Sequence, residues 1–267
     1  MNPAETLKGL NIGFMEGQGG YRADLPTLVM VHGAGGSSRI WHGQVHPLGK
    51  EANTLALDLP GHGNSPGPGR DSIASYAEWL HDVLGRLPGD RLFLMGHSMG
   101  GAIVQEAALR FPDMFSGIIL AATGPRLSVA PQFLEGLTDR FEGTVETIIK
   151  YAYAPDADPA LIRQGAQLMK EPGAIVVHDD FLACDRFDRR KDLPHLRVPC
   201  LIICGEEDKL SPPVLSQRLR DALPNATLVM VPSAGHMVMI ENFKAFNRAV
   251  LDFIVFSGHS LRSLKKE

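Results

Sequence analysis

Six short apolar runs recur along this chain of 267 residues. They are apolar on both faces, which is typical of parallel strands that helices cover on each side. Helical patterns alternate with the runs, and this alternation predicts an α/β fold with a mostly parallel central sheet flanked by helices. The runs cover residues 27–31, 54–57, 91–95, 116–121, 200–204 and 227–231, and the helical patterns cover residues 73–87, 100–111, 213–223 and 243–256.

One more strand is expected near residues 10–16, before the first of these runs. It is followed by Gly-Gln-Gly-Gly at residues 17–20, and glycines favour a tight turn because they adopt positive φ angles easily. We therefore expect a hairpin to another strand, which would make one edge of the sheet antiparallel.

Residues 124–198 interrupt the alternation, because they contain no strong strand signal. The interval is far longer than the roughly 2–6 residues of an ordinary strand–helix connection. We interpret it as a helical cap inserted into a core of residues 1–123 and 199–267. The cap is expected over the carboxyl edge of the sheet, where open α/β sheets bind ligands. Its helical patterns cover residues 132–141, 144–153, 159–169 and 175–187.

The composition is that of an ordinary globular protein, with 44% hydrophobic and 21% charged residues and a formal net charge of -4. This balance gives no electrostatic case for nucleic-acid binding, and the basic residues 262–266 are expected to be a solvated end. No apolar stretch reaches the roughly 18–20 residues of a membrane helix. Residues 1–5 lack the layout of a secretory signal. We expect a cytoplasmic protein without a membrane span.

The three cysteines support the same compartment. Their number is odd and their spacing forms no disulfide framework, which favours reduced thiols in the cytosol. Cys200 and Cys204 bound an expected strand, so their default role is to fill the core. Cys184 lies in the expected cap.

No cofactor or metal is expected. A glycine-rich stretch at residues 33–38 fails the dinucleotide pattern because its last position is Ser38. His42 and His46 have the spacing of a zinc helix, but Gly43 stands where the glutamate should follow and Pro47 comes next.

The candidate nucleophile is Ser98, which follows an apolar run and lies in the sequence Gly-His-Ser-Met-Gly at residues 96–100. Glycines two residues before and after a serine permit a sharp turn from a strand into a helix. Such a turn exposes the serine at the end of the strand. A serine hydroxyl is a poor nucleophile unless a base takes its proton and a carboxylate orients that base.

The chain supplies both groups after later strands. His236 follows the run 227–231 and is the candidate base. Asp208 follows the run 200–204 and is the candidate acid, with Glu206 and Glu207 as close rivals. Asp208 is favoured because it closes the four-residue motif Gly-x-x-Asp that begins at Gly205. The order Ser, Asp, His is that of α/β-hydrolases.

An oxyanion hole needs two backbone donors near the serine. The N–H of Met99, directly after the serine, is the first candidate. The N–H of Ala34, in His-Gly-Ala-Gly-Gly at residues 32–36, is the second. We expect His32 and His97 to be structural. The same holds for Asp58 and His62, which lie in a second glycine-rich loop at residues 58–65.

These motifs, taken in order, resemble the α/β-hydrolase superfamily, specifically its capped, cofactor-free branch. The resemblance covers nearly the whole chain apart from the cap and includes Asp-x-Pro-Gly-His-Gly-x-Ser at residues 58–65. It implies a serine hydrolase that cleaves a carboxylic ester or a related acyl bond, such as a thioester or lactone, in a small-molecule substrate. Two alternatives stay open: a carbon–carbon bond hydrolase of ring-fission products, and a slow-turnover ligand receptor of the same fold.

Substrate choice is expected to depend on the cap. Its apolar residues could line an acyl pocket or form the cap's own core, and the charged run 185–190 is expected to be a solvated face with local ion pairs. The apolar candidates are Phe133, Leu137, Phe141, Ile148, Tyr151, Leu168 and Phe181.

Overall fold

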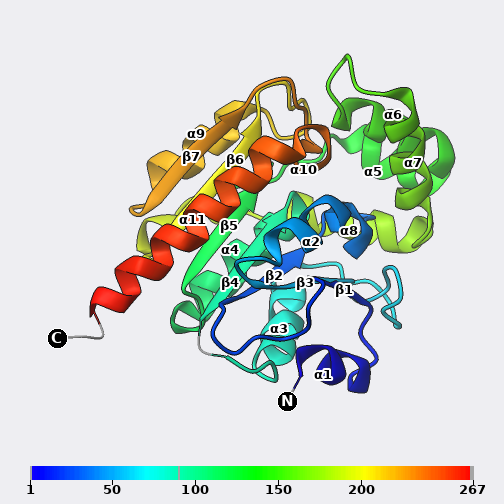
Figure 1. The fold of residues 1–267 in the computed structure, drawn as a ribbon. Coiled ribbons are helices and arrows are strands. Elements are labelled where there is room, and N and C mark those ends of the chain that lie inside the picture. The colour runs from blue at the N-terminus through cyan, green and yellow to red at the C-terminus, as the bar shows by residue number, and fades with distance from the viewer. Residues whose placement is uncertain (1, 90, 265–267) are drawn as a thin grey trace.

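The computed structural model describes residues 2–89 and 91–264, without the side chains of residues 257–264. A sheet of seven strands forms its centre (Figure 1). All neighbouring strands are parallel except the first pair, which confirms the expected α/β class. In their order across the sheet the strands are β1 (Phe14–Glu16), β3 (Asn53–Leu57), β2 (Thr27–Val31), β4 (Leu92–His97), β5 (Gly117–Ala121), β6 (Cys200–Gly205) and β7 (Ala226–Val231).

The expected antiparallel edge exists, but the expected hairpin is wrong. β1 pairs with β3, where Phe14 lies opposite Leu57, and not with β2, the next strand in the chain. β2 cannot accept β1 because β3 and β4 occupy both of its edges. The chain between β1 and β2 forms no strand.

Helices cover both faces of the sheet (Figure 1). Within β2, Val29 and Val31 face one helical layer, and Leu28 and Met30 face the other. All four are fully buried, and each such burial contributes about 1.5–3 kcal/mol. One layer contains α3 (Ile73–Leu84), α4 (Met99–Arg110) and α9 (Pro213–Ala222), and the other contains α2 (His42–Leu48), α10 (Val238–Glu241) and α11 (Phe243–Leu264).

A short helix at the N-terminus, α1 (Pro3–Gly9), was not expected from the sequence. The side chain of Asn2 caps it by accepting a hydrogen bond of 3.0 Å from the N–H of Ala4. Pro3 stands at the first helical position, and Leu7 is fully buried. The Asn-Pro pair is a helix-start signal that could have revealed this helix.

Four helices fill the interval between β5 and β6, at each of the expected places. They lie to one side of the sheet in Figure 1 and share a cluster of apolar side chains of their own. The last of them also contributes Ala183 and Cys184 to the main core. The helices are α5 (Pro131–Asp139), α6 (Phe141–Ala152), α7 (Pro159–Lys170) and α8 (Ala174–Arg186), and the single-turn helices elsewhere are Ser38–Trp41, Pro112–Met114 and Leu193–His195.

The cysteines are buried and unpaired, as expected. Burial raises the pKa of each thiol, that of Cys204 to about 11, so they stay protonated at neutral pH. In residues 2–89 and 91–264, none of the helices combines the length and hydrophobicity that a membrane span needs. The basic residues 262–266 lie outside the described side chains.

Candidate active site

Ser98 lies at the junction between β4 and α4. Its backbone has φ 53° and ψ -116°, a conformation that few non-glycine residues adopt. A Cβ atom on Gly96 would collide with the backbone of Gly100, and one on Gly100 would collide with the carbonyl oxygens of Val31 and His32. Both flanking glycines are therefore needed for this turn, as the sequence indicates.

Asp208 and His236 meet at the carboxyl edge of the sheet. The loop after β6 carries the aspartate and the loop after β7 carries the histidine. The Nδ1–H of His236 donates to Oδ2 of Asp208 at 2.9 Å. The other carboxylate oxygen accepts from the backbone N–H groups of Leu210, at 2.9 Å, and Ser211, at 2.8 Å. These contacts fix the buried carboxylate in one orientation.

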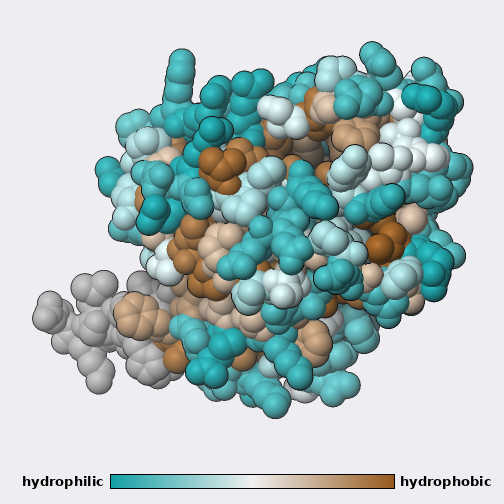
Figure 2. Space-filling model, turned by 90° about the horizontal axis from the view of Figure 1, so that it is seen from above, coloured by the Kyte–Doolittle hydropathy of each residue, from teal (hydrophilic) through white to brown (hydrophobic). Residues whose placement is uncertain are grey.

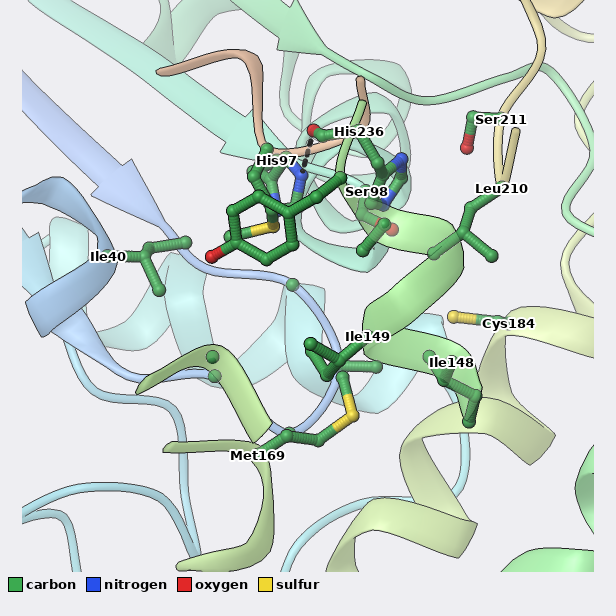
Figure 3. A pocket seen from close by; sticks show the side chains of 18 of the residues that line it. Ile40, His97, Ser98, Ile148, Ile149, Met169, Cys184, Leu210, Ser211 and His236 are labelled. Carbon is green, nitrogen blue, oxygen red and sulfur yellow. Dashed lines mark hydrogen bonds between the residues drawn. The ribbon is translucent and has the colours of Figure 1, made fainter. Parts of the chain in front are cut away.

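The rival acids point elsewhere, since Glu206 and Glu207 are exposed. Bonding of Nδ1 to the carboxylate makes Nε2 of His236 the ring nitrogen with a free lone pair. Figure 3 shows the His236 ring and the Ser98 side chain next to each other at one wall of a cavity. Ser98, Asp208 and His236, the residues that the sequence selects, thus lie together at this edge of the sheet.

Two backbone N–H groups near Ser98 have no acceptor among the described residues. They belong to Met99, the first residue of α4, and to Ala34, in the loop after β2. Unengaged N–H groups at a helix N-terminus and in a glycine-rich loop can bind an oxyanion.

His32 orients the peptide that carries the Ala34 N–H. Its Nε2 accepts a hydrogen bond of 3.0 Å from the N–H of Leu59, so its proton lies on Nδ1 and is donated to the carbonyl of Gly33 at 2.8 Å. Burial and the nearby His62 lower the pKa of His32 to about 3, which keeps it neutral. Because the Gly33 carbonyl is held, the Ala34 N–H of the same trans peptide points the opposite way.

His97 is buried beneath the site and supports the loop of His236. Its Nε2–H donates to the carbonyl oxygen of His236 at 3.0 Å (Figure 3, dashed line). The other ring nitrogen has no partner among the described residues. Burial, and then the neighbouring His236, hold the pKa of His97 well below its ordinary value. His97 is thus a neutral packing and hydrogen-bonding residue, as expected.

A cavity of about 990 Å³ opens in front of Ser98 and His236. Its walls are mostly apolar, and on the face seen from above, hydrophobic side chains gather in a hollow bordered by hydrophilic ones (Figure 2). A cavity of this kind suits a ligand with an apolar part. No group of three or more His, Cys, Asp or Glu side chains in the described ranges could hold a metal ion.

The expected pocket residues divide into two groups. Phe133, Ile148, Leu168 and Phe181 line the cavity. The others do not: Leu137 is buried among the inserted helices, Phe141 packs against that cluster, and Tyr151 is 48% exposed. These apolar residues of the inserted helices thus serve both of the purposes that the sequence allowed.

The charged run 185–190 forms ion pairs, as expected. Arg186 pairs with Asp71 at 3.2 Å, and Arg190 pairs with Asp188 at 2.5 Å. Arg189 contacts Glu106 on α4. The pair of Arg190 and Asp188 is local, whereas Arg186 and Arg189 pair with residues of the core that are distant in the sequence. Arg190 also lines the cavity.

Sequence reasoning missed the residues that join α6 to the loop of His236. The carboxylate of Glu241 on α10 accepts hydrogen bonds from the N–H of Ala154, at 2.7 Å, and of Gly235, at 3.0 Å. Burial is the main cause that raises the pKa of Glu241. No local pattern marks such a residue, because its partners are distant in the sequence.

The sequence profile of the alpha/beta hydrolase family matches residues 28–249, and the chain belongs to this family. It is 30% identical to the pimeloyl-(acyl-carrier protein) methyl ester esterase of Pectobacterium atrosepticum, over 85% of this chain and 93% of the relative. It is also 31% identical to the polyketide synthase ThaQ of Burkholderia thailandensis, over 90% of this chain, but the match spans only 12% of ThaQ.

Solved structures agree with the family. A thermophilic esterase superposes with a TM-score of 0.82 at 30% identity, covering 92% of this chain and 94% of the esterase. The superposition thus extends over most of both chains.

Proposed function

We propose that the protein is a serine hydrolase that cleaves a carboxylic ester or a related acyl bond. The observation that carries the proposal is the Asp208–His236 hydrogen bond at the wall of the cavity that Ser98 also lines. The esterase names of a sequence relative and of a solved structure support it. The largely apolar cavity favours a substrate with an apolar acyl or alkyl part.

The first half of the reaction forms an acyl-enzyme. Nε2 of His236 takes the hydroxyl proton of Ser98 while Oγ attacks the substrate carbonyl, and Asp208 stabilises the resulting imidazolium. The N–H groups of Ala34 and Met99 donate to the tetrahedral oxyanion. His236 then gives its proton to the leaving oxygen, and the carbon–oxygen bond breaks.

The second half releases the acid. His236 takes a proton from water, and the hydroxide attacks the acyl carbonyl of the Ser98 ester. The same two N–H groups stabilise the second oxyanion. When it collapses, Ser98 leaves and recovers its proton from His236, so the enzyme returns to its starting state.

We also propose that residues 124–198 act as a cap that selects the substrate, over a core of residues 1–123 and 199–267. The cap helices supply much of the apolar lining of the cavity, including Phe133, Ile148 and Phe181. Changes in these side chains would alter acyl-chain preference without touching the residues proposed to react.

The test combines a variant with covalent labelling. Ser98→Ala should reduce hydrolysis of a short p-nitrophenyl ester by about three orders of magnitude or more while the circular dichroism spectrum stays unchanged. A fluorophosphonate should add its mass at Ser98 alone. Full activity of Ser98→Ala would refute the mechanism. A panel of esters, thioesters, lactones and a dienone acid then ranks the bond types.

A further inference from the structure

Asp180, on α8, carries a carboxylate that the proposed reaction does not use. Its side chain is fully buried. An ionised carboxylate in the interior costs several kcal/mol unless it is paired and hydrogen-bonded. Its neighbour on the same helix, Asp179, is part-exposed and contacts His178. The position of Asp180 therefore needs a specific explanation.

Three segments of the core donate hydrogen bonds to Asp180. Oδ2 accepts from the backbone N–H of Gly35 at 2.8 Å and from Nε2–H of His62 at 2.8 Å. Oδ1 accepts from the hydroxyl of Tyr76 at 2.7 Å. These donors come from the loop after β2, the loop after β3 and helix α3. One residue of the inserted helices thus holds three separate parts of the core.

His62 is the counter-ion of this carboxylate. Its Nδ1 faces the carbonyl of Pro60 at 3.0 Å, and its Nε2 faces Asp180, so both ring nitrogens have acceptors and both carry protons. Burial is the largest single influence on the pKa of His62 and lowers it, but the charge and the hydrogen bond of Asp180, together with the hydrogen bond to Pro60 and the charge of Asp58, raise that pKa above its ordinary value. Asp180 and His62 thus form a buried ion pair next to the loop of residues 32–36.

The Gly35 N–H belongs to the loop that carries the Ala34 donor. Residues 33–36 form a turn closed by the Gly36 N–H and the Gly33 carbonyl at 3.0 Å, with φ +63° at Gly35. The central peptide of such a turn, between Ala34 and Gly35, can face either of two ways, which is the difference between turn types I and II. The bond to Asp180 selects one of them.

Rotation of that peptide would change ψ of Ala34 and φ of Gly35 together. The backbone of Ala34 is thereby held on one side by His32 through the Gly33 carbonyl and on the other side by Asp180 through the Gly35 N–H. An oxyanion donor is effective only when it is fixed before the charge develops.

We propose that Asp180 is a positioning residue that fixes the Ala34 oxyanion donor from helix α8, so that catalysis requires the inserted helices to be docked on the core. The inference rests on the proposed function. It makes the cap a part of the catalytic apparatus as well as a lid over the substrate.

A role in docking α8 alone would also explain the burial of Asp180, and kinetics separates the two. A docking role affects stability. A positioning role affects the stabilisation of the transition state more than the binding of the substrate, so it lowers kcat and leaves KM nearly unchanged.

The experiment uses Asp180→Asn, which keeps the shape of the side chain but removes its charge and one acceptor oxygen. Asp179→Asn is the matched control on the same helix. Tyr76→Phe removes the Oδ1 partner and leaves the bond to Gly35 in place. We would measure four quantities for each full-length variant: kcat, KM, the melting temperature and the inhibition constant of a trifluoromethyl ketone. Such a ketone forms a tetrahedral adduct on serine.

For Asp180→Asn we expect kcat to fall about 10- to 100-fold, less than or equal to the loss of a whole oxyanion donor. KM should change less than twofold, and the ketone should bind more weakly by a similar factor. Tyr76→Phe should lower the melting temperature with kcat retained, and Asp179→Asn should change neither. If Asp180→Asn does not fold, Asp180→Ser replaces it, because a buried water can take the place of the lost oxygen.

An unchanged kcat in a folded Asp180 variant would overturn the proposal, as would an equal loss of kcat in Tyr76→Phe. The proposed function and the proposed role of Asp180 can be refuted separately. If Ser98→Ala keeps full activity, the proposed function is wrong. If Ser98→Ala is inactive while the Asp180 variant is normal, only the role of Asp180 is wrong.

Discussion

The backbone N–H of His236 donates a hydrogen bond of 2.8 Å to the carbonyl oxygen of Ala152, the last residue of α6. The loop of the proposed base is therefore joined directly to the inserted helices. Gly235 lies so close to this joint that a Cβ atom there would press against the backbone of Tyr153 and Ala154. The position of His236 depends on the segment above it as well as on β7 below it.

Glu241 closes this joint, and its replacement should loosen it. Glu241→Gln leaves one oxygen for two N–H donors, those of Ala154 and Gly235. We expect a loss of about 1–3 kcal/mol in the free energy of unfolding, since one buried donor becomes unsatisfied, and a lower kcat. Urea unfolding and ester hydrolysis measure the two effects. Glu207→Gln, at an exposed side chain, is the control, and equal behaviour of the two variants would contradict the role of Glu241.

Asp208→Asn should reduce kcat by about four orders of magnitude, because an amide at this place no longer holds His236 in the required tautomer. The reason lies in the 2.9 Å bond between the carboxylate and Nδ1. The exposed Glu207 has no such contact, so Glu207→Gln should remain active. If Glu207→Gln proved to be the inactive variant, the acid would be wrongly assigned.

The sequence predicted the parts of the site that are encoded locally. Ser98, Asp208 and His236 each follow a strand, and the carboxyl ends of parallel strands meet at one edge of a sheet. The glycines around Ser98 could be interpreted from sterics alone. The pairing of β1 could not be predicted locally. It depends on the other strands, because β3 and β4 already occupy both edges of β2.

The supporting residues could not be predicted, because their roles depend on long-range contacts. Asp180 binds the Gly35 N–H across 145 positions in the chain, and Glu241 binds the Ala154 N–H across 87. A lone acid in an amphipathic helix is ordinarily a solvated residue. Only the packing of α8 on the core, and of the chain after α6 on α10, gives these two carboxylates their partners.

The serine turn permits a paired test with glycine variants. Gly100→Ala should destabilise the protein strongly or prevent folding, because its Cβ atom would collide with the carbonyl oxygens of Val31 and His32. Gly143 lies in α6, and a Cβ atom added there would meet no atom within 4 Å apart from the neighbouring backbone of its own helix. Gly143→Ala should stabilise the protein by about 0.5–1 kcal/mol through helix propensity. Thermal unfolding compares the two, and a tolerated Gly100→Ala would refute the steric argument.

Two buried neutral histidines should make the protein sensitive to mild acid. Burial is the main cause that lowers the pKa of His32, to about 3, and that of His97. In the unfolded chain both titrate near 6.5. Below that pH the unfolded state binds more protons than the folded state, so stability falls as the pH falls, by up to about 1.4 kcal/mol per unit for each histidine.

His62 contributes in the opposite direction, and in a different range. Asp180 helps to raise the pKa of His62 in the folded state, against the effect of burial. The stability that protonated His62 gives the folded protein is therefore complete below about pH 6.5, and it is lost as the pH rises through the folded-state pKa. Between pH 5 and 6.5 only His32 and His97 among these three should contribute a slope. Urea unfolding across that range should show a loss of stability as the pH falls, which the raised pKa of Glu241 offsets in part. His97→Gln should reduce the slope by about half or more. A stability that does not change with pH in the unaltered protein would show that His32 and His97 accept protons without unfolding. They would then not be the neutral hydrogen-bonding supports of Gly33 and His236.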